Sequence, residues 1–381
     1  MAVSQASLWN EGKLHLGLIF AKDRASRTAR TLALGSLHFD TGLRRWGVEV
    51  GGDDLSEPFT YAVHRRSMVS VGAVEEHFAA VEREYGRLRR ALGLRYLGDP
   101  AESLFERLTD RELRARFEPK EVSAGFATVE RSVDPERVAE RVRAALAAEP
   151  RVRFLGGRHV RRVRRDGDGT LEVEHADWPG QGHEVRPYRH VVNALWRDRL
   201  RVDAELGLHP RRPWLFRYKL ALHVKPSRPL ESTPSSTTLL LGPFGDVVNF
   251  GGRRLYLSWY PACRLGSWQG VSEGGWKGGV GEEVRRRVFD RTLARLGEVI
   301  PGLSDAPIAR EDTSVEGGVI FNWGKTDITD PASEVHERWD IGVHSRGGYH
   351  SIDTGKYCMA PLFALQVAER ITSDRRAPQL A

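Results

Sequence analysis

Cysteine is scarce in this chain of 381 residues, which has only Cys263 and Cys358. The two residues are far apart, no C-x-x-C pair occurs, and no histidines cluster at the spacing of metal ligands. Because zinc sites and disulfide frameworks need several such residues at short intervals, the sequence predicts neither a metal site nor a structural disulfide. This cysteine usage suits a reducing cytoplasm.

Long apolar runs are absent as well. No stretch approaches the ~20 apolar residues that span a bilayer. The first residues also lack the basic and apolar segments of a secretory signal. We therefore expect a soluble, cytoplasmic protein without a membrane partner.

Two glycine motifs that bind phosphate groups are missing. The pattern G-x-G-x-x-G fails where it comes nearest, because Gly279 and Gly281 are followed by Val284 at its third position. The segment GKT at 324–326 resembles the end of a Walker A loop, but Val319 stands where the first glycine of that loop belongs. The sequence therefore does not predict a P-loop enzyme.

Positive charge is in slight excess, with 58 Lys and Arg against 51 Asp and Glu, a net charge of +7. Such a balance suits nucleic acid or small anionic substrates. Most of the arginines alternate with acidic residues on helical stretches such as EEVRRRVFDR, which is typical of solvated helix faces. We expect no nucleic-acid partner, since that alternative depends on charge alone.

Helical segments are marked by apolar spacing and by caps. Apolar residues recur at steps of three and four from Ser70 to Leu92, and Ser70 is placed to cap this helix. Asp134 and Pro135 mark the cap and first turn of a second helix. Further helices are expected at 28–37, 104–117 and 282–299.

Strand-like segments occupy much of the rest. The sequence predicts a strand at 152–155, a hairpin formed by 159–163 and 170–175, and a buried strand at 190–195. From residue 214 onward four β segments follow one another, and two more strands lie at 317–323 and 337–345. This order predicts a mixed α/β fold.

Both ends of the chain carry polar, glycine-containing loops beside apolar segments. Near the carboxyl end, Thr354 and Gly355 are predicted to begin an apolar helix, whose free backbone N–H groups suit an anion or an electron-rich carbonyl. The segment ASLWNEGKLHLG, residues 6–17, forms the other loop. A frayed terminus seldom combines Trp, Asn and His in this way, which favours a binding site.

Together these two ends resemble the D-amino-acid oxidase family of FAD-dependent oxidoreductases. Residues 6–17 are similar to the loop that follows the nucleotide-binding βαβ unit of that family, and GGYHSIDTGKY at 347–357 is similar to its carboxy-terminal flavin-covering segment. The order of the segments between them is also similar. The family's opening strand, G-x-G-x-x-G turn and helix have no counterpart, so we expect either a start codon placed too late or a real truncation.

The resemblance implies a truncated FAD-binding Rossmann-like lobe formed by 1–40, 120–205 and 335–381. A mixed and antiparallel β-sheet substrate lobe with helices would comprise 41–119 and 206–334. The cofactor would be FAD, and the residues that would hold it are Ser7, Asn10, Gly12, Val160, Asn193, Ala194, Ser351, Thr354, Gly355, Lys356 and Tyr357.

The activity implied by the resemblance is hydride removal from a carbon that bears an amine or hydroxyl, with flavin N5 as acceptor. His15, Arg254 and Tyr256 are the candidate catalytic residues, and Arg254 is expected to bind a substrate carboxylate. The substrate is expected to be a small amine or hydroxy acid. The alternative is a non-catalytic flavoprotein remnant that acts as a binding module.

Overall fold

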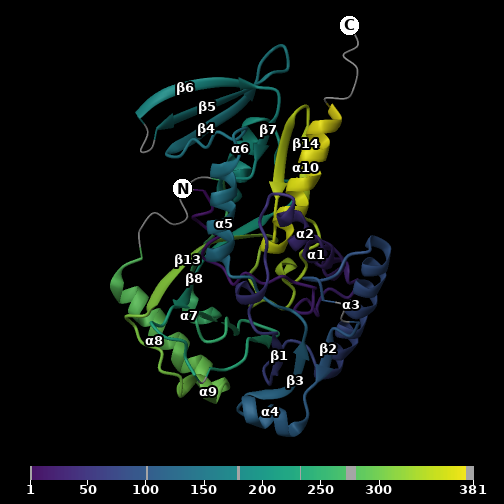
Figure 1. Cartoon of the computed structure of the whole chain (residues 1–381), viewed down its shortest axis with the longest axis vertical. Helices are drawn as coiled ribbons and strands as arrows, with labels where there is room; N and C mark the ends of the chain where they lie inside the picture. The colour runs from purple at the N-terminus through teal and green to yellow at the C-terminus, as the bar shows by residue number, and fades with distance from the viewer. Residues whose placement is uncertain (1, 100–101, 178–180, 232, 272–279, 375–381) are drawn as a thin grey trace.

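The structure of the protein is a computed structural model that describes residues 2–99, 102–177, 181–231, 233–271 and 280–374. It contains one nine-stranded sheet and two three-stranded sheets, with helices packed around them (Figure 1). No helix in these ranges is long and apolar enough to cross a membrane. The mixed α/β class predicted from the sequence is confirmed.

The large sheet has the strand order β12-β8-β11-β10-β9-β1-β3-β2, and β13 also pairs with β8. Its longest pair, β8 and β13, is antiparallel over its full length. The strands are β1 (Thr60–His64), β2 (Phe105–Arg107), β3 (Val122–Thr128), β8 (Trp214–Val224), β9 (Thr237–Leu240), β10 (Gly245–Asn249), β11 (Leu255–Trp259), β12 (Arg264–Trp268) and β13 (Thr313–Trp323).

The two smaller sheets lie at the other end of the long axis (Figure 1). One has the order β14-β15-β7, in which β15 pairs antiparallel with β14 and parallel with β7. The other is the meander β4-β5-β6. Their strands are β4 (Arg158–Arg165), β5 (Leu171–Asp177), β6 (Gln181–Tyr188), β7 (Val191–Asn193), β14 (Gly342–Arg346) and β15 (Tyr349–Asp353).

Helices cover the sheets and complete two large apolar cores. One core joins the amino-terminal segment to helices from both ends of the chain, through residues such as Leu14, Phe78 and Phe363. The second lies between the large sheet and α8, with Leu257 and Val288 at its centre. The helices are α1 (Arg27–Leu37), α2 (Phe39–Arg44), α3 (Val71–Leu92), α4 (Asp110–Arg116), α5 (Pro135–Ala148), α6 (Arg199–Glu205), α7 (Tyr260–Cys263), α8 (Glu282–Val299), α9 (Pro301–Ser304) and α10 (Ala360–Asp374).

The predicted helix caps are confirmed. The Ser70 hydroxyl accepts a hydrogen bond from the Ala73 N–H at the start of α3. The Asp134 carboxylate accepts from the Glu136 and Arg137 N–H groups at the start of α5, where Pro135 occupies the first turn. The starts of α3 and α5 are therefore set by hydrogen bonds between residues that are close in the sequence.

Three predicted elements differ from the structure. Residues 152–155 form no strand, and Phe154 is 56% exposed, because no neighbouring strand pairs with this segment in the described chain. Residues 104–117 do not form one helix, since Phe105 to Arg107 pair with β3 before α4 begins. Thr354 and Gly355 precede a 3₁₀ turn, η5 (Tyr357–Met359), and α10 starts only at Ala360.

The amino-terminal loop, residues 6–17, is held tightly against the segment that follows β3. Asn10 Oδ1 accepts the Gly12 N–H at 2.7 Å, and the Gly12 carbonyl accepts the Val133 N–H at 3.0 Å. Gly12 has φ +67°, and a Cβ there would lie 1.9 Å from the Val133 carbonyl oxygen. Only glycine fits this approach.

Gly12→Ala is expected to lower the free energy of unfolding by about 2–4 kcal/mol, because it adds a left-handed alanine and a backbone clash. Gly47→Ala is the matched control, since Gly47 has φ +72° with no atom within 4 Å of an added Cβ. The control should cost about 1 kcal/mol. Urea unfolding measures both, and equal losses would show that the contact with Val133 is unimportant.

Candidate functional site

Polar side chains from three distant parts of the chain converge where the amino-terminal loop meets the large sheet. The loop contributes an acid, a lysine and a histidine. Strands β8, β10 and β11 contribute a second group, and the turn before η5 adds one lysine. We call this group the lysine cluster, and its members are Glu11, Lys13, His15, Lys219, Asp246, Tyr256, Ser258 and Lys356.

Lys13 is almost fully buried, with 2% of its surface exposed. Its Nζ lies 3.3 Å from Asp246 Oδ1, donates to the Thr238 hydroxyl, and stands 3.8 Å from the centre of the Phe59 ring. A buried ammonium group needs such partners, because desolvation alone would be costly. The position of Lys13 is therefore fixed by strands β9 and β10.

Lys219 projects from β8 toward β11. Its Nζ donates to the Ser258 hydroxyl at 3.1 Å and to the Tyr256 hydroxyl at 3.4 Å. Burial lowers the pKa of Lys219, but the nearby Tyr256, Glu11 and Asp246 outweigh it and raise the pKa above its usual value. Lys219 therefore stays protonated at neutral pH.

Glu11 and His15 form a pair whose charge states are set by burial and by the nearby lysines. His15 Nε2 lies 3.6 Å from Glu11 Oε1. Burial and the charge of Lys356 lower the pKa of His15 to about 3, so its imidazole is neutral at pH 7. Burial raises the pKa of Glu11, but its contact with His15 and the charges of Lys356, Lys219 and Lys13 hold that pKa well below the usual range.

Lys356 enters the cluster from the carboxy-terminal turn. Burial lowers the pKa of its ammonium to about 8, although Glu11 acts in the opposite direction. The preceding Gly355 has φ +62°, and a Cβ there would lie 2.6 Å from Ile341. This tight turn brings Lys356 toward Glu11 and His15, two residues that lie more than three hundred positions earlier in the sequence.

Three of the predicted site residues, His15, Tyr256 and Lys356, belong to the cluster. Arg254 is engaged elsewhere, because its Nη1 contacts Asp134 and lies 3.5 Å from Glu136 Oε2. Gly12 and Asn10 shape the loop, and Asn10 Nδ2 donates to the carbonyls of Ala6 and Ser7 at 2.9 Å.

Four other residues that were expected to hold the cofactor lie in other surroundings. Asn193 donates to the Asp203 carboxylate at 2.9 Å and to the Tyr349 hydroxyl at 2.8 Å, and Ser351 donates to the same carboxylate at 2.7 Å. The hydrogen-bonding groups of Asn193 and Ser351 are thus occupied by neighbouring side chains of the protein. Val160 lies on β4 and packs against a small apolar cluster that includes Leu171 and Val202, and Ala194 is exposed.

The remaining predicted residues lie around the carboxy-terminal turn. The Thr354 carbonyl accepts the Lys356 N–H at 2.5 Å. The Tyr357 ring packs against Phe39, with 5.7 Å between ring centres.

Lys13, Lys219 and Asp246 were missed by sequence reasoning. Lys219 did leave a signal, since it interrupts the apolar strand FRYKLALHV. Asp246 has no local pattern that marks it, and Lys13 is one more polar residue of a polar loop. Their convergence depends on strand neighbours that no local pattern specifies.

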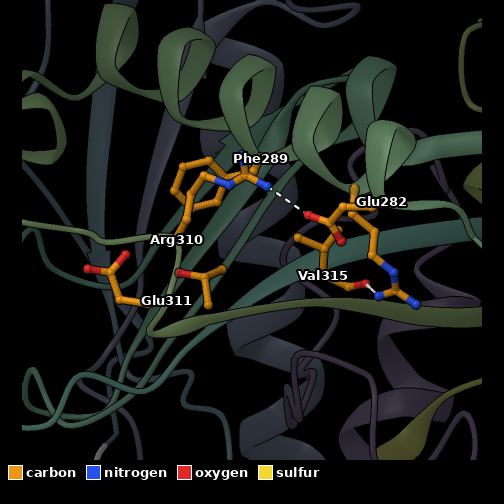
Figure 2. A pocket seen from close by; sticks show the side chains of 7 residues that line it. Glu282, Phe289, Arg310, Glu311 and Val315 are labelled. Atoms are coloured by element: carbon orange, nitrogen blue, oxygen red, sulfur yellow. Dashed lines mark hydrogen bonds and ion pairs between the residues drawn. The ribbon is translucent and has the colours of Figure 1, made fainter.

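A separate surface cavity of about 380 Å³ lies between α8 and β13 (Figure 2). Its charged side chains are largely paired, since Arg310 lies 2.8 Å from Glu282 and Arg285 lies 2.6 Å from Glu316. Within the described ranges no group of three or more residues has the composition of a metal site. The lysine cluster is therefore the stronger candidate for chemistry.

Lys13→Met should lower the free energy of unfolding by about 2–4 kcal/mol, because it leaves the Asp246 carboxylate without its ammonium partner. Adding Asp246→Asn should recover part of that loss, since the uncompensated charge is then removed. Thermal and urea unfolding of the two single variants and the double variant give the coupling. Strictly additive losses would contradict a direct Lys13–Asp246 interaction.

Solved structures and one family model are similar to this chain. No curated protein matches the chain. Among solved structures, glycine oxidase from Geobacillus kaustophilus has a TM-score of 0.59 at 16% identity, covering 99% of this chain and 87% of that one. L-Amino acid deaminase from Proteus myxofaciens, in complex with anthranilate, has a TM-score of 0.58 at 12% identity, covering 100% and 84%.

Iminodiacetate oxidase from Chelativorans sp. BNC1 has a TM-score of 0.57 at 15% identity, covering 97% of this chain and 86% of that one. At these identities the likeness establishes the fold. A family model described as FAD dependent oxidoreductase, DAO, matches residues 3–323, which is most of the chain. The protein therefore belongs to the DAO family of FAD-dependent oxidoreductases.

Proposed function

We propose that the lysine cluster is the reaction site at which this oxidoreductase removes a hydride from a small amine or hydroxy acid. The observation that supports this site is the convergence of the amino-terminal loop, the face of the large sheet and the carboxy-terminal turn on one set of buried charges. The cofactor of the family is FAD. When bound, FAD supplies the hydride acceptor.

The residues of the cluster fit the polar edge of a flavin ring. His15 Nδ1 is buried and has no hydrogen-bond partner among the described residues. No carboxylate of the described residues lies within 4 Å of the Lys356 ammonium. Buried groups of this kind need a polar ligand. We assign His15 and the Gly355–Lys356 turn to the cofactor ring, with Lys356 stabilising negative charge on the reduced cofactor.

Two other residues that were expected to hold the cofactor do not fit in the same way. The side chains of Asn193 and Ser351 both donate hydrogen bonds to the Asp203 carboxylate. The sequence also has no glycine-rich phosphate turn. Val152, Phe154 and Leu155 are 36–56% exposed, which is unusual for a segment of strand character. We propose that a βαβ unit outside these 381 residues pairs with this segment and binds the ADP half of FAD.

The domain boundaries predicted from the sequence are retained as part of this proposal. The cytoplasmic location is retained as well, and it is supported by two cysteines that are both buried free thiols.

A second candidate function is a non-catalytic binding module. The hydrogen bonds of Asn193 and Ser351 to Asp203 favour it, because these side chains cannot bind a cofactor without breaking a buried network. FAD affinity separates the two candidates.

Residues 1–381 alone should bind FAD weakly, because a ring site without a phosphate site loses much of the contact surface. Joining an upstream strand-G-x-G-x-x-G-helix unit in frame should raise the affinity at least about 100-fold. Visible absorbance of protein-bound flavin after gel filtration measures this. A colourless extended protein would favour the binding module, and tight binding by residues 1–381 would remove the need for the extra unit.

Lys356→Met should lower the reduction potential of bound flavin and decrease kcat. The Lys356 ammonium, with a pKa of about 8, is charged below pH 8 and neutral above it, so its contribution falls as pH rises through 8. The pH profile of kcat/KM should therefore lose a limb near pH 8 in the variant. Lys325→Met, which changes an exposed lysine, is the control. An unchanged potential and profile would exclude this role for Lys356.

A further inference from the structure

A second row of polar side chains lies at one end of the small sheet formed by β7, β15 and β14, outside the lysine cluster. The hairpin of β14 and β15 places Ser345 opposite His350. Ser345 Oγ lies 2.8 Å from His350 Nδ1, and His350 Nε2 lies 3.3 Å from Nδ1 of His190, the residue before β7. We call these three residues the serine row.

The serine row is buried in its middle and open at its hydroxyl end. His350 is 1% exposed, whereas Ser345 is an exposed residue. Arg370 on α10 fixes the hydroxyl, since its Nη1 donates to Ser345 Oγ and to the Val343 carbonyl, each at 2.8 Å. The hydroxyl is therefore the part of the row that a molecule from solution can reach.

A groove of about 730 Å³ opens beside Ser345. It lies between the β14–β15 hairpin and the carboxy-terminal half of α10, which are neighbours in Figure 1. All of its side chains are polar, with Gln366 and Glu369 among those from α10, and the turn glycines Gly347 and Gly348 complete its wall. It is distinct from the lysine cluster, because β15 runs from this groove toward the turn that contains Lys356.

Stability does not account for the serine row. An arginine can only donate, so Ser345 Oγ accepts from Arg370 and its own hydrogen is available for His350 Nδ1. In that tautomer His350 Nε2 donates to His190 Nδ1, and His190 Nε2 carries a hydrogen. His190 Nε2 is buried and has no hydrogen-bond partner among the described residues. A buried donor without a partner lowers stability, which favours a functional reason for the row.

The charge state of His350 suits a proton acceptor. Burial lowers its pKa, and the charges of His190 and Arg370 act in the same direction, against that of Asp374. His350 is therefore neutral at pH 7. A nucleophile within hydrogen-bond reach of a base, with a third group holding that base, is the arrangement used in nucleophilic catalysis.

We propose that Ser345 is the nucleophile of a second, hydrolytic activity, that His350 is its general base, and that the substrate is a small ester of a short-chain carboxylic acid. This inference goes beyond the proposed oxidation and does not depend on it. His190 is a positioning residue, because it acts through His350. The short acyl chain follows from the groove, whose side chains offer no apolar wall for a longer one.

The reaction has two steps. Ser345 Oγ first forms a bond to the carbonyl carbon of the ester, and its proton passes to His350 Nδ1. Arg370 and the N–H groups of the Gly347–Gly348 turn are the donors that the groove offers to the negative carbonyl oxygen. The bond to the alcohol oxygen then breaks, and the alcohol leaves with the proton from His350.

The second step removes the acyl group from Ser345. Water attacks the acyl carbon and gives a proton to His350, and the bond from that carbon to Ser345 Oγ breaks. The carboxylic acid leaves, and the proton on His350 returns to the serine oxygen. The net reaction is hydrolysis of one ester bond by one water molecule, without an oxidant or a reductant.

The experiment uses the full chain of 381 residues. Phenylmethylsulfonyl fluoride, which sulfonylates activated serines with loss of fluoride, is the covalent probe, and peptide mass spectrometry locates the label. p-Nitrophenyl acetate and p-nitrophenyl octanoate are the substrates, followed by nitrophenolate absorbance. The variants are Ser345→Ala, His350→Gln, His190→Phe and Ser373→Ala. Ser373 is an exposed serine of the same groove, so its variant removes a hydroxyl outside the serine row.

In the wild type the label should be found on Ser345, and the acetate ester should be hydrolysed faster than the octanoate ester. Ser345→Ala and His350→Gln should each lower kcat at least about 100-fold. His190→Phe should lower kcat about 10-fold and leave KM unchanged, which a merely structural role would not do. Ser373→Ala should be labelled and should hydrolyse as the wild type does.

Thermal melting checks that each variant is folded. Ser345 is exposed, so Ser345→Ala carries the test if the buried His350→Gln variant does not fold. The proposal is wrong if the wild type is not labelled at Ser345, if Ser345→Ala hydrolyses acetate ester as fast as the wild type, or if the octanoate ester is preferred. None of these measurements uses the flavin, so their outcome is independent of the proposed oxidation.

Discussion

The carboxyl group of Glu130 ties the amino-terminal loop to the large sheet, and the lysine cluster depends on this contact. Glu130 is fully buried, accepts the Leu16 N–H at 2.5 Å and also accepts the Tyr61 hydroxyl. Burial raises the pKa of Glu130, although Lys13 and the hydrogen bonds act in the opposite direction. Fixing Leu16 fixes the residues just before it, and these include Glu11, Lys13 and His15. The chemistry of the site is thus set by an acid outside it.

Much of the fold could be predicted from local signals. Helices α3, α5 and α8 have spacing or caps that depend only on their own residues. The segment 152–155 shows the limit of such signals, since a strand needs a neighbouring strand and the described chain supplies none. The start of α10 was also predicted too early, because Gly355 is left-handed, Lys356 is extended and the 3₁₀ turn η5 comes before Ala360.

The residues of the candidate site could be predicted from the sequence only in part. His15 and Lys356 belong to loops whose composition marked them, and Tyr256 lies on a strand with a clear polar face. Arg254 was assigned to the substrate because a strand arginine usually serves an acid, but the acids that hold it come from α5, more than one hundred residues earlier. Charge pairing across such distances is decided by the tertiary fold, and no short window of sequence contains it.

The assembly of the lysine cluster from residues 11–15, 219–258 and 356 also has a kinetic consequence. Contacts between segments so far apart form late, since each requires a large loop to close first. The first apolar core shares this requirement, since it also joins the amino-terminal segment to helices from both ends of the chain. Ligands that bridge the three segments would then favour the finished state by mass action. Occupancy of the site would thereby report that folding is complete and protect the protein from degradation.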